Sequence, residues 1–428
     1  MKIFSFLFLI MCVSGFSCTM KNPKVDINHL AEKYVRLGLA IGEYDGDFVD
    51  AYYGPDSLKP TVVKAAVFPK DSFLNAVSML KNELSDDIDK HDDTAVKRAK
   101  WMINQLTAFD RRIRNYSGEF TSFDEETLAL FGVKAPDNLE AHFSELVKTL
   151  DSLLPGTGTI PERMQELSKK YIIPKDKIDT IFKTAYREAR KRTLDHYTLP
   201  AEESFEFEFV TDKPWSGYNW YKGNYHSLIQ QNLDLPIYID RAIDLACHEG
   251  YPGHHVYNTL LEKNLYHDKG WIEISMYPLF SPQSLIAEGS ANYGVHLTFP
   301  EEEMRSFVKE KLFPLADFDT TAADIYFNSL AIKEELNFAR NEVARGFLNK
   351  TMDSTTAIHW LTEYSLVSME QAVKSLSFIK KYRSYVINYN YGQQLVKNYI
   401  ESRASTPDKK WEEFGKLLSN EVRTEELK

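Results

Sequence analysis

Five residues of this chain have types and spacings suited to binding a metal ion. His248 is followed at once by Glu249, and two more histidines, His254 and His255, come six and seven positions after His248. Imidazoles and carboxylates are common protein ligands of Zn²⁺, and a carboxylate beside the metal can accept a proton from a bound water. Another acidic residue, Glu288, lies in an otherwise apolar stretch of small residues. These residues predict a zinc centre that activates water for hydrolysis.

The spacing of the histidines departs from that of a continuous zinc-binding helix. Residues four apart share a helix face, but the fourth residue after His248 is Pro252. In an unbroken helix His254 would lie about 120° from the face of His248, and His255 about 10 Å further along the axis. Pro252 and Gly253 favour a broken or widened turn, which would bring one of these histidines back over His248. We favour His254, because omitting two inserted residues restores the four-residue spacing; His255 remains the alternative ligand.

The third ligand is expected from a separate helix. Glu288 is followed by Gly289, and small residues of this kind let two helices approach closely. Asn292 comes one turn after Glu288 and could hydrogen-bond the second ring nitrogen of His248. Glu249, directly after the first ligand, is placed to act as the general base.

A C-terminal cluster of polar aromatic residues supplies two further catalytic candidates. Arg383 stands in Arg383-Ser384-Tyr385, and Tyr389 opens Tyr389-Asn390-Tyr391-Gly392. A tyrosine hydroxyl or an arginine here could stabilise an oxyanion or hold a substrate carboxylate. Aromatic packing beside a solvated arginine explains either residue equally well.

Hydrophobic periodicity and composition predict a mainly α-helical protein with a small antiparallel β-sheet. Hydrophobic residues make up 43% of the chain and charged residues 26%, and the net charge of −11 argues against binding to nucleic acid. We expect a helical N-terminal subdomain over 19–198 and a catalytic subdomain over 199–428. Period-two alternation predicts a strand at Ser204–Val210, with more strand in Tyr218–Gln231. The expected helices are His29–Ile41, Asp71–Leu84, Thr94–Ile113, Leu139–Leu154, Lys175–Leu194, Pro282–His296, Thr320–Asn349, Thr355–Tyr364, Met369–Tyr382 and Leu395–Ser402.

The N-terminus has the pattern of an export signal. Lys2 precedes an apolar run from Ile3 to Phe16 that is too short to span a bilayer. Gly15-Phe16-Ser17-Cys18 resembles a loose bacterial lipobox, so we expect residues 1–18 to be a signal and Cys18 to carry a lipid. Ordinary secretory cleavage is the alternative. The prediction is an exported bacterial protein, periplasmic or at the cell surface, that meets the membrane only through the lipid on Cys18.

The motif also carries a family resemblance. His248-Glu249-x-x-Pro252-Gly253-His254-His255 followed by Glu288-Gly289-x-Ala291 resembles the bacterial family known as domain of unknown function 885. That family is similar to zinc metallopeptidases whose third ligand is a Glu. The resemblance covers residues 200–400 and, more weakly, Val49–Pro55; Ser290 departs from it, where a bulkier aromatic is typical. It implies a metallopeptidase-like helical fold, a bound zinc ion and a peptide substrate.

Two functions from different classes fit these observations. The first is a zinc-dependent peptidase that hydrolyses short peptides, with His248, His254 and Glu288 as ligands and Glu249 as the base. The second is a zinc-containing surface lipoprotein without catalysis, which would serve as a binding or scaffold protein. Substitution of Glu249 separates the two.

Overall fold

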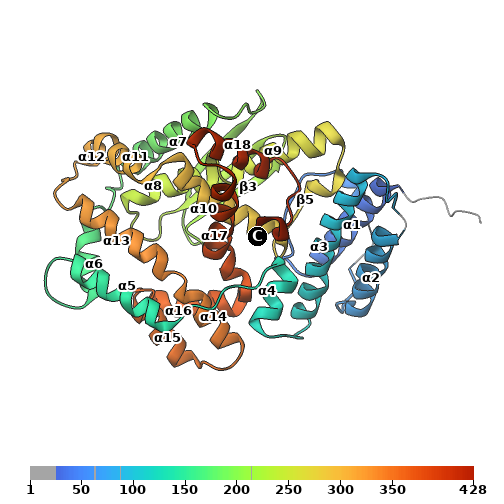
Figure 1. Ribbon diagram of the computed structural model, residues 1–428, viewed down its shortest axis with the longest axis horizontal. Helices are drawn as coiled ribbons and strands as arrows, with labels where there is room; N and C mark the ends of the chain where they lie inside the picture. Colours follow the sequence, from blue (N-terminus) through green and yellow to red (C-terminus); the bar gives the residue numbers. More distant parts are fainter. Residues whose placement is uncertain (1–25, 62–63, 87, 214) are drawn as a thin grey trace, which may run out of the picture.

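The computed structural model of the protein describes residues 26–61, 64–86, 88–213 and 215–428 (Figure 1). The expected signal at 1–18, with Cys18, lies outside the described residues. The chain is mainly helical, as predicted, and its described residues form two small sheets where the sequence predicted one. Along the described residues, no helix combines the length and the apolar character needed to cross a membrane.

Helices dominate the first half of the chain, and apolar stripes explain why they form. In the first helix Leu30, Tyr34 and Ile41 are fully buried on one face, and Asp26 caps its N-terminus by accepting from the backbone N–H of Asn28. The helices of this half are α1 (Ile27–Gly42), α2 (Lys70–Asp86), α3 (Asp93–Tyr116), α4 (Phe123–Phe131), α5 (Glu140–Leu153), α6 (Ile160–Lys169) and α7 (Ile178–Leu194). Both α4 and α6, which periodicity did not predict, begin with capping boxes.

The larger sheet has three strands, β2 (Ser204–Val210), β3 (Gly217–Gly223) and β4 (His226–Asn232), in the order β2-β4-β3. The prediction of a purely antiparallel sheet is wrong in one respect: β3 pairs antiparallel to β4, but β2 pairs parallel to it. A tight turn at Asn224 and Tyr225, both with positive φ, folds β3 and β4 into a hairpin. That hairpin places β4 beside β2 in the same direction and leaves β3 at an edge.

The second half is again helical, around a central pair of helices. Its helices are α8 (Ile239–Leu245), α9 (His254–Leu261), α10 (Pro282–Thr298), α11 (Glu301–Phe307), α12 (Phe313–Ala316), α13 (Ala323–Leu336), α14 (Ala339–Leu348), α15 (Ser354–Glu363), α16 (Met369–Tyr382), α17 (Ile387–Arg403) and α18 (Pro407–Leu418). Figure 1 shows α10 and α17 in the middle of the molecule, with α1, α2 and α3 to one side and α5, α6 and α13 to the other.

One helix that the sequence predicts as continuous forms two helices in the structure. The expected continuous helix Thr320–Asn349 breaks between α13 and α14 at Asn337 and Phe338. The side-chain amide of Asn390 donates to the carbonyl oxygen of Asn337 at 3.2 Å, and this tertiary contact stabilises the break. A periodic apolar pattern can continue across such a break, so periodicity alone did not reveal it.

The two halves of the chain are joined through the core. The strand β1 (Val49–Tyr52) pairs antiparallel with β5 (Met276–Pro278) to form the second sheet. Arg98 of α3 makes a two-pronged ion pair with buried Glu273, at 2.6 and 2.9 Å. The strand β1 therefore reaches the region of the histidine motif, and the division at 198/199 stays a prediction.

Candidate metal centre

The histidine motif folds as a helix that breaks and restarts. The chain forms one π-helical turn, η2 (Ala246–Gly250), becomes extended at Tyr251 and re-enters helix α9 at His254. Gly253 closes the break: its N–H donates to the carbonyl oxygen of Cys247 at 2.8 Å, and a Cβ at this position would clash with the carbonyl oxygen of His248. The break at Pro252 and Gly253 that the spacing predicted is present, and it turns the second half of the motif back over the first.

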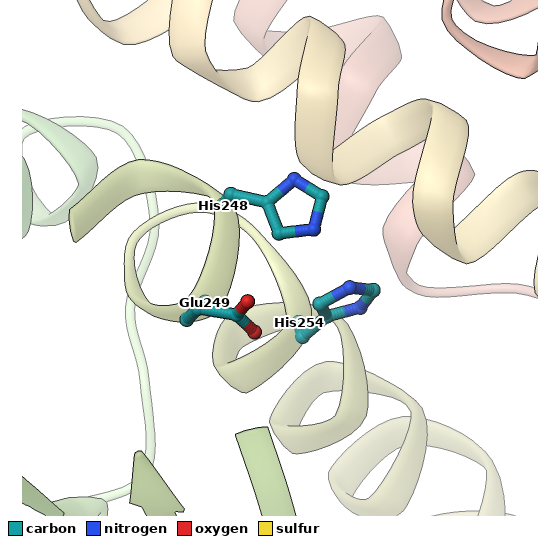
Figure 2. A group of neighbouring side chains, drawn as sticks. All are labelled: His248, Glu249 and His254. Carbon is teal, nitrogen blue, oxygen red and sulfur yellow. The ribbon is translucent and has the colours of Figure 1, made fainter. Parts of the chain in front are cut away.

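This break brings two imidazoles and a carboxylate together. Ligand atoms of His248, Glu249 and His254 all lie within 4.8 Å of one another, so the three residues form a group that could hold a metal ion. The two imidazole rings are nearly perpendicular, with centroids 4.8 Å apart. Figure 2 shows the three side chains around a common space next to the broken helix.

Glu288 reaches the same two histidines from α10. Its Oε2 lies 3.4 Å from Nε2 of His248 and 3.7 Å from Nε2 of His254, and its Oε1 accepts a hydrogen bond from the Tyr385 hydroxyl at 2.9 Å. Oε2 is buried and has no hydrogen-bond partner. A buried carboxylate oxygen facing two imidazole nitrogens fits a bound cation, because leaving it unpaired is unfavourable.

Two sets of three candidate ligands are therefore present, and they differ in their carboxylate. The group within 4.8 Å contains Glu249, whereas the orphaned oxygen belongs to Glu288. We weigh the orphaned oxygen more heavily, because it contacts both imidazoles while its other oxygen is fixed by Tyr385. With Glu288 as the third ligand, Glu249 stays free beside the metal position.

Backbone packing fixes the helix that carries Glu288. A Cβ on Gly289 would clash with the backbone of Gly392, so α10 and α17 touch main chain to main chain at these glycines. The close approach expected from the small residues around Glu288 is present. It allows Tyr385, which precedes α17, to reach Glu288.

Asn292 sets the orientation of the His248 ring. Its side-chain amide donates to the carbonyl oxygen of Tyr389 at 2.7 Å, which turns its oxygen towards Nδ1 of His248, 2.9 Å away. Nδ1 must then carry the proton, and Nε2 is left as a lone-pair donor pointing at Glu288. The contact between Asn292 and His248 expected from the sequence is present.

The ionisable groups of this cluster shift one another's pKa values. Burial lowers the pKa of His248, but Glu288 and Glu249 more than offset this and raise the pKa above its usual value. Burial raises the pKa of Glu288, but His248 and His254 outweigh it and hold the pKa well below the usual range. Each shift shows that the cluster favours positive charge next to Glu288.

His255, the alternative ligand, lies in a different environment. Its Nε2 is 2.8 Å from Oε1 of Glu203, and its Nδ1 is 2.8 Å from the hydroxyl of Ser227. Tyr251 and Arg190 also donate to Glu203. Both ring nitrogens are engaged in the core, so the structure brings His254, and not His255, to the metal position.

The two catalytic candidates from the C-terminal cluster, Tyr389 and Arg383, lie in different parts of the structure. Tyr389 is near the centre: its carbonyl accepts from Asn292, and its ring is 5.8 Å from that of Tyr385. Arg383 instead pairs with the buried Glu126, at 2.7 Å, and its guanidinium stacks on Phe120. The structure does not bring Arg383 together with the histidines.

A cavity of about 2310 Å³ opens over the metal group. This is larger than the few hundred to about 1,000 Å³ typical of a small-molecule site, so it has room for an extended chain. The edge strand β3 lines it through Tyr218 and Trp220, whose rings are 4.4 Å apart. Asn219 ties this strand to the motif by donating to the carbonyl oxygen of Glu249 at 2.6 Å.

Asp50 is a residue of this cavity that the sequence reading missed. It comes from β1 and accepts a hydrogen bond from the Tyr218 hydroxyl. Burial raises the pKa of Asp50 to about 6, although Tyr218 and His254 oppose the shift. The one signal was the weaker part of the family resemblance, Val49–Pro55, which marks the stretch but not the residue.

One comparison with a solved structure supports the fold. No family model matches the chain, and no curated protein matches it in sequence. A crystal structure of a candidate lipoprotein from Colwellia psychrerythraea aligns with a TM-score of 0.53 at 14% identity, over 83% of this chain and 65% of that protein. Trypanosoma cruzi metallocarboxypeptidase 1 aligns with a TM-score of 0.40 at 10% identity, over 89% and 86%. A candidate lipoprotein of unknown function from Shewanella oneidensis aligns with a TM-score of 0.44 at 14% identity, over 78% and 65%.

The likeness to the Colwellia protein is one of fold. This chain spans about 65% of that protein's length. The chain is a mainly helical protein with a distant structural similarity to a candidate lipoprotein from Colwellia psychrerythraea, and it carries a His-Glu-His group that could bind a metal ion.

Proposed function

We propose that the protein is a zinc-dependent peptidase whose metal is held by His248, His254 and Glu288. The observation that carries the proposal is the orphaned Oε2 of Glu288, which lies 3.4 and 3.7 Å from the two imidazole nitrogens. Two imidazoles and one carboxylate form the ligand set of several zinc hydrolases and leave a position open for water. A zinc ion bound there supplies the Lewis acidity that makes this water nucleophilic near neutral pH.

The residues around the ligands divide the remaining work. Glu249 is left without a ligand role and accepts the proton of the attacking water, which it then passes to the leaving amine. Asn292 holds the Nε2 of His248 free for the metal, and the Tyr385 hydroxyl holds Glu288. The hydroxyl of Tyr389, a cavity residue close to Glu288 and Glu249, is the donor we assign to the oxyanion of the tetrahedral intermediate, because the Tyr218 hydroxyl already donates to Asp50.

The cavity supports a peptide as substrate. The edge strand β3 offers backbone groups to an extended chain beside Glu249, in the manner of strand addition. The motif's resemblance to the domain of unknown function 885 family belongs to this proposal, as does anchoring of an exported chain through Cys18. A zinc-binding surface protein without catalysis is the alternative.

Glu249→Gln tests the proposal. The zinc-loaded protein and the variant are incubated with a library of short unstructured peptides, and products are identified by mass spectrometry. Loss of the general base is expected to lower kcat by about 10²- to 10⁴-fold while zinc binding is kept. Glu335→Gln, which removes an exposed carboxylate of the same cavity, should retain full activity. Normal turnover by Glu249→Gln contradicts the mechanism, and zinc binding without any cleavage by the unmodified protein supports the scaffold function.

A further inference from the structure

Arg340 is a cation of the cavity without a counter-charge among the described residues. It stands at the start of α14, lines the cavity, and its guanidinium lies over the ring of Phe378, 5.0 Å from the centroid. Its Nε is buried without a hydrogen-bond partner, and no carboxylate within the described residues forms an ion pair with it. Burial lowers the pKa of Arg340, and the neighbouring Tyr389 opposes that shift.

Other arginines of the same cavity are neutralised by the protein itself. Arg241 donates to Asp244, and Arg305 donates to Glu301 and to Asn328. A half-buried guanidinium without such a partner is unfavourable, because its charge loses water and gains no counter-charge. The planar fork of arginine matches a carboxylate in two hydrogen bonds, so a carboxylate is the ligand that best completes Arg340.

A short series of hydrogen bonds connects Arg340's helix to the metal group. Asn341, the next residue along α14, donates to the side chain of Asn390 at 2.9 Å. Asn390 follows Tyr389, whose carbonyl oxygen accepts from Asn292, and Asn292 contacts His248. Arg340 is therefore held in a fixed relation to the metal position, by helices that pack on one another.

We propose that Arg340 binds the C-terminal carboxylate of the substrate, so that the cavity selects peptides with a free carboxyl end. The inference rests on the proposed peptidase function and gives it a direction: bonds near the carboxyl end of a short peptide are brought to the metal. Recognition of the amino end of the peptide has a weaker basis. Asp50, the carboxylate that would hold an amino terminus, already accepts the hydroxyl of Tyr218.

The test separates binding from turnover. Zinc-loaded Glu249→Gln is dialysed to equilibrium against a library of N-acetylated tetrapeptides, supplied once as free acids and once as C-terminal amides, and the retained peptides are quantified by mass spectrometry. The acids are expected to be retained about 10- to 100-fold more strongly than the amides, the value of a charge-assisted hydrogen-bonded pair. Adding Arg340→Gln should remove this preference.

Controls distinguish a binding role from a structural one. Arg305→Gln removes the same charge from the same cavity and should keep the preference, because Arg305 is already paired. Arg340→Lys keeps the charge but loses the fork, so it should retain part of the preference even if Arg340→Gln folds poorly. Equal retention of acids and amides, or a preference that survives Arg340→Gln, overturns the inference. Preferential retention of acids without cleavage by the unmodified protein overturns the peptidase function and leaves the carboxylate site standing.

Discussion

His254 and His255 are neighbours in the chain but belong to two clusters of opposite character. The ring of His254 faces an open cavity and the Oε2 of Glu288, a buried oxygen without a hydrogen-bond partner. The ring of His255 is fully buried, and both of its nitrogens have partners, in Glu203 and Ser227. Each cluster pairs histidine with a glutamate, but only in the His254 cluster does a glutamate oxygen, the Oε2 of Glu288, lack a hydrogen-bond donor.

This difference teaches how to distinguish a binding site from a structural cluster. The Glu203 cluster is complete, because its carboxylate receives hydrogen bonds from Tyr251 and Arg190 as well as from His255. The Glu288 cluster is incomplete, because the lone pairs of its Oε2 receive no hydrogen bond and are available to a cation. Completeness of hydrogen bonding, more than residue type, makes His254 and not His255 the candidate metal ligand.

The strongest test of the comparison is to remove each histidine in turn. We expect His254→Ala to weaken zinc binding by more than the about 10- to 100-fold that loss of an outer partner causes, because a ligand itself is lost. His255→Ala should leave zinc affinity nearly unchanged but lower the free energy of unfolding of the zinc-free protein by about 3 kcal/mol, since it breaks a buried pair. Chelator competition and urea unfolding measure the two quantities. Equal loss of zinc in both variants would place His255 in the metal site after all.

A pH series tests the Glu203 cluster alone. Burial raises the pKa of Glu203, but hydrogen bonds from His255 and Tyr251 outweigh it and lower the pKa to about 2. A carboxyl with a lowered pKa in the folded state stabilises the protein above its unfolded pKa of 4.5, and this stabilisation is lost as the pH falls towards 2.

We therefore expect the free energy of unfolding of the unmodified protein to be larger than that of the Glu203→Gln variant. The expected difference is about 3 kcal/mol at pH 6 and about 1.5 kcal/mol at pH 3. Urea unfolding at the two pH values measures the difference. Glu206→Gln, which changes an exposed carboxylate of β2, serves as the control and should show no such dependence. A difference that stays constant with pH would show that Glu203 does not titrate in this range.

The smallest expected effect concerns the ring of His248. Asn292→Ala removes the acceptor of Nδ1–H, and the ring can then rotate or change tautomer. We expect zinc affinity to fall by about 10- to 100-fold with no change in fold. Asn232→Ala is the matched control. Asn232 lines the cavity, and among the described residues its side chain bonds to backbone groups alone, those of Lys213, Trp215 and Asp234. Unchanged affinity in Asn292→Ala would show that the metal position does not depend on this contact.

The sequence indicated the local parts of the fold and site well. Apolar stripes predicted α1 and α3 with their buried residues, because periodicity reports the face that a helix buries. The residue types around Pro252 predicted the break in the motif, because proline and glycine act on the backbone within a few residues. The close approach at Gly289 followed from residue size in the same way.

What the sequence did not indicate depends on contacts between distant segments. The hydrogen bond from Asn390 helps to split α13 from α14, and no residue inside the predicted helix signals that partner. Asp50 enters the cavity because β1 pairs with β5, more than two hundred residues away. Arg383 pairs with a buried glutamate whereas Arg340 lines the cavity without such a partner, and no local pattern contains that information.

The position of Gly253 has a consequence for recognising such centres. The second histidine is not placed by the pitch of a helix; it is placed by a reversal of the main chain, pressed against the carbonyl oxygen of His248. The conformation of this reversal then sets how many residues separate the two histidines, and a reversal of another conformation would allow another number. A search for zinc sites that demands a fixed four-residue interval would pass over this chain, whereas one that allows a longer gap closed by proline and glycine would retain it.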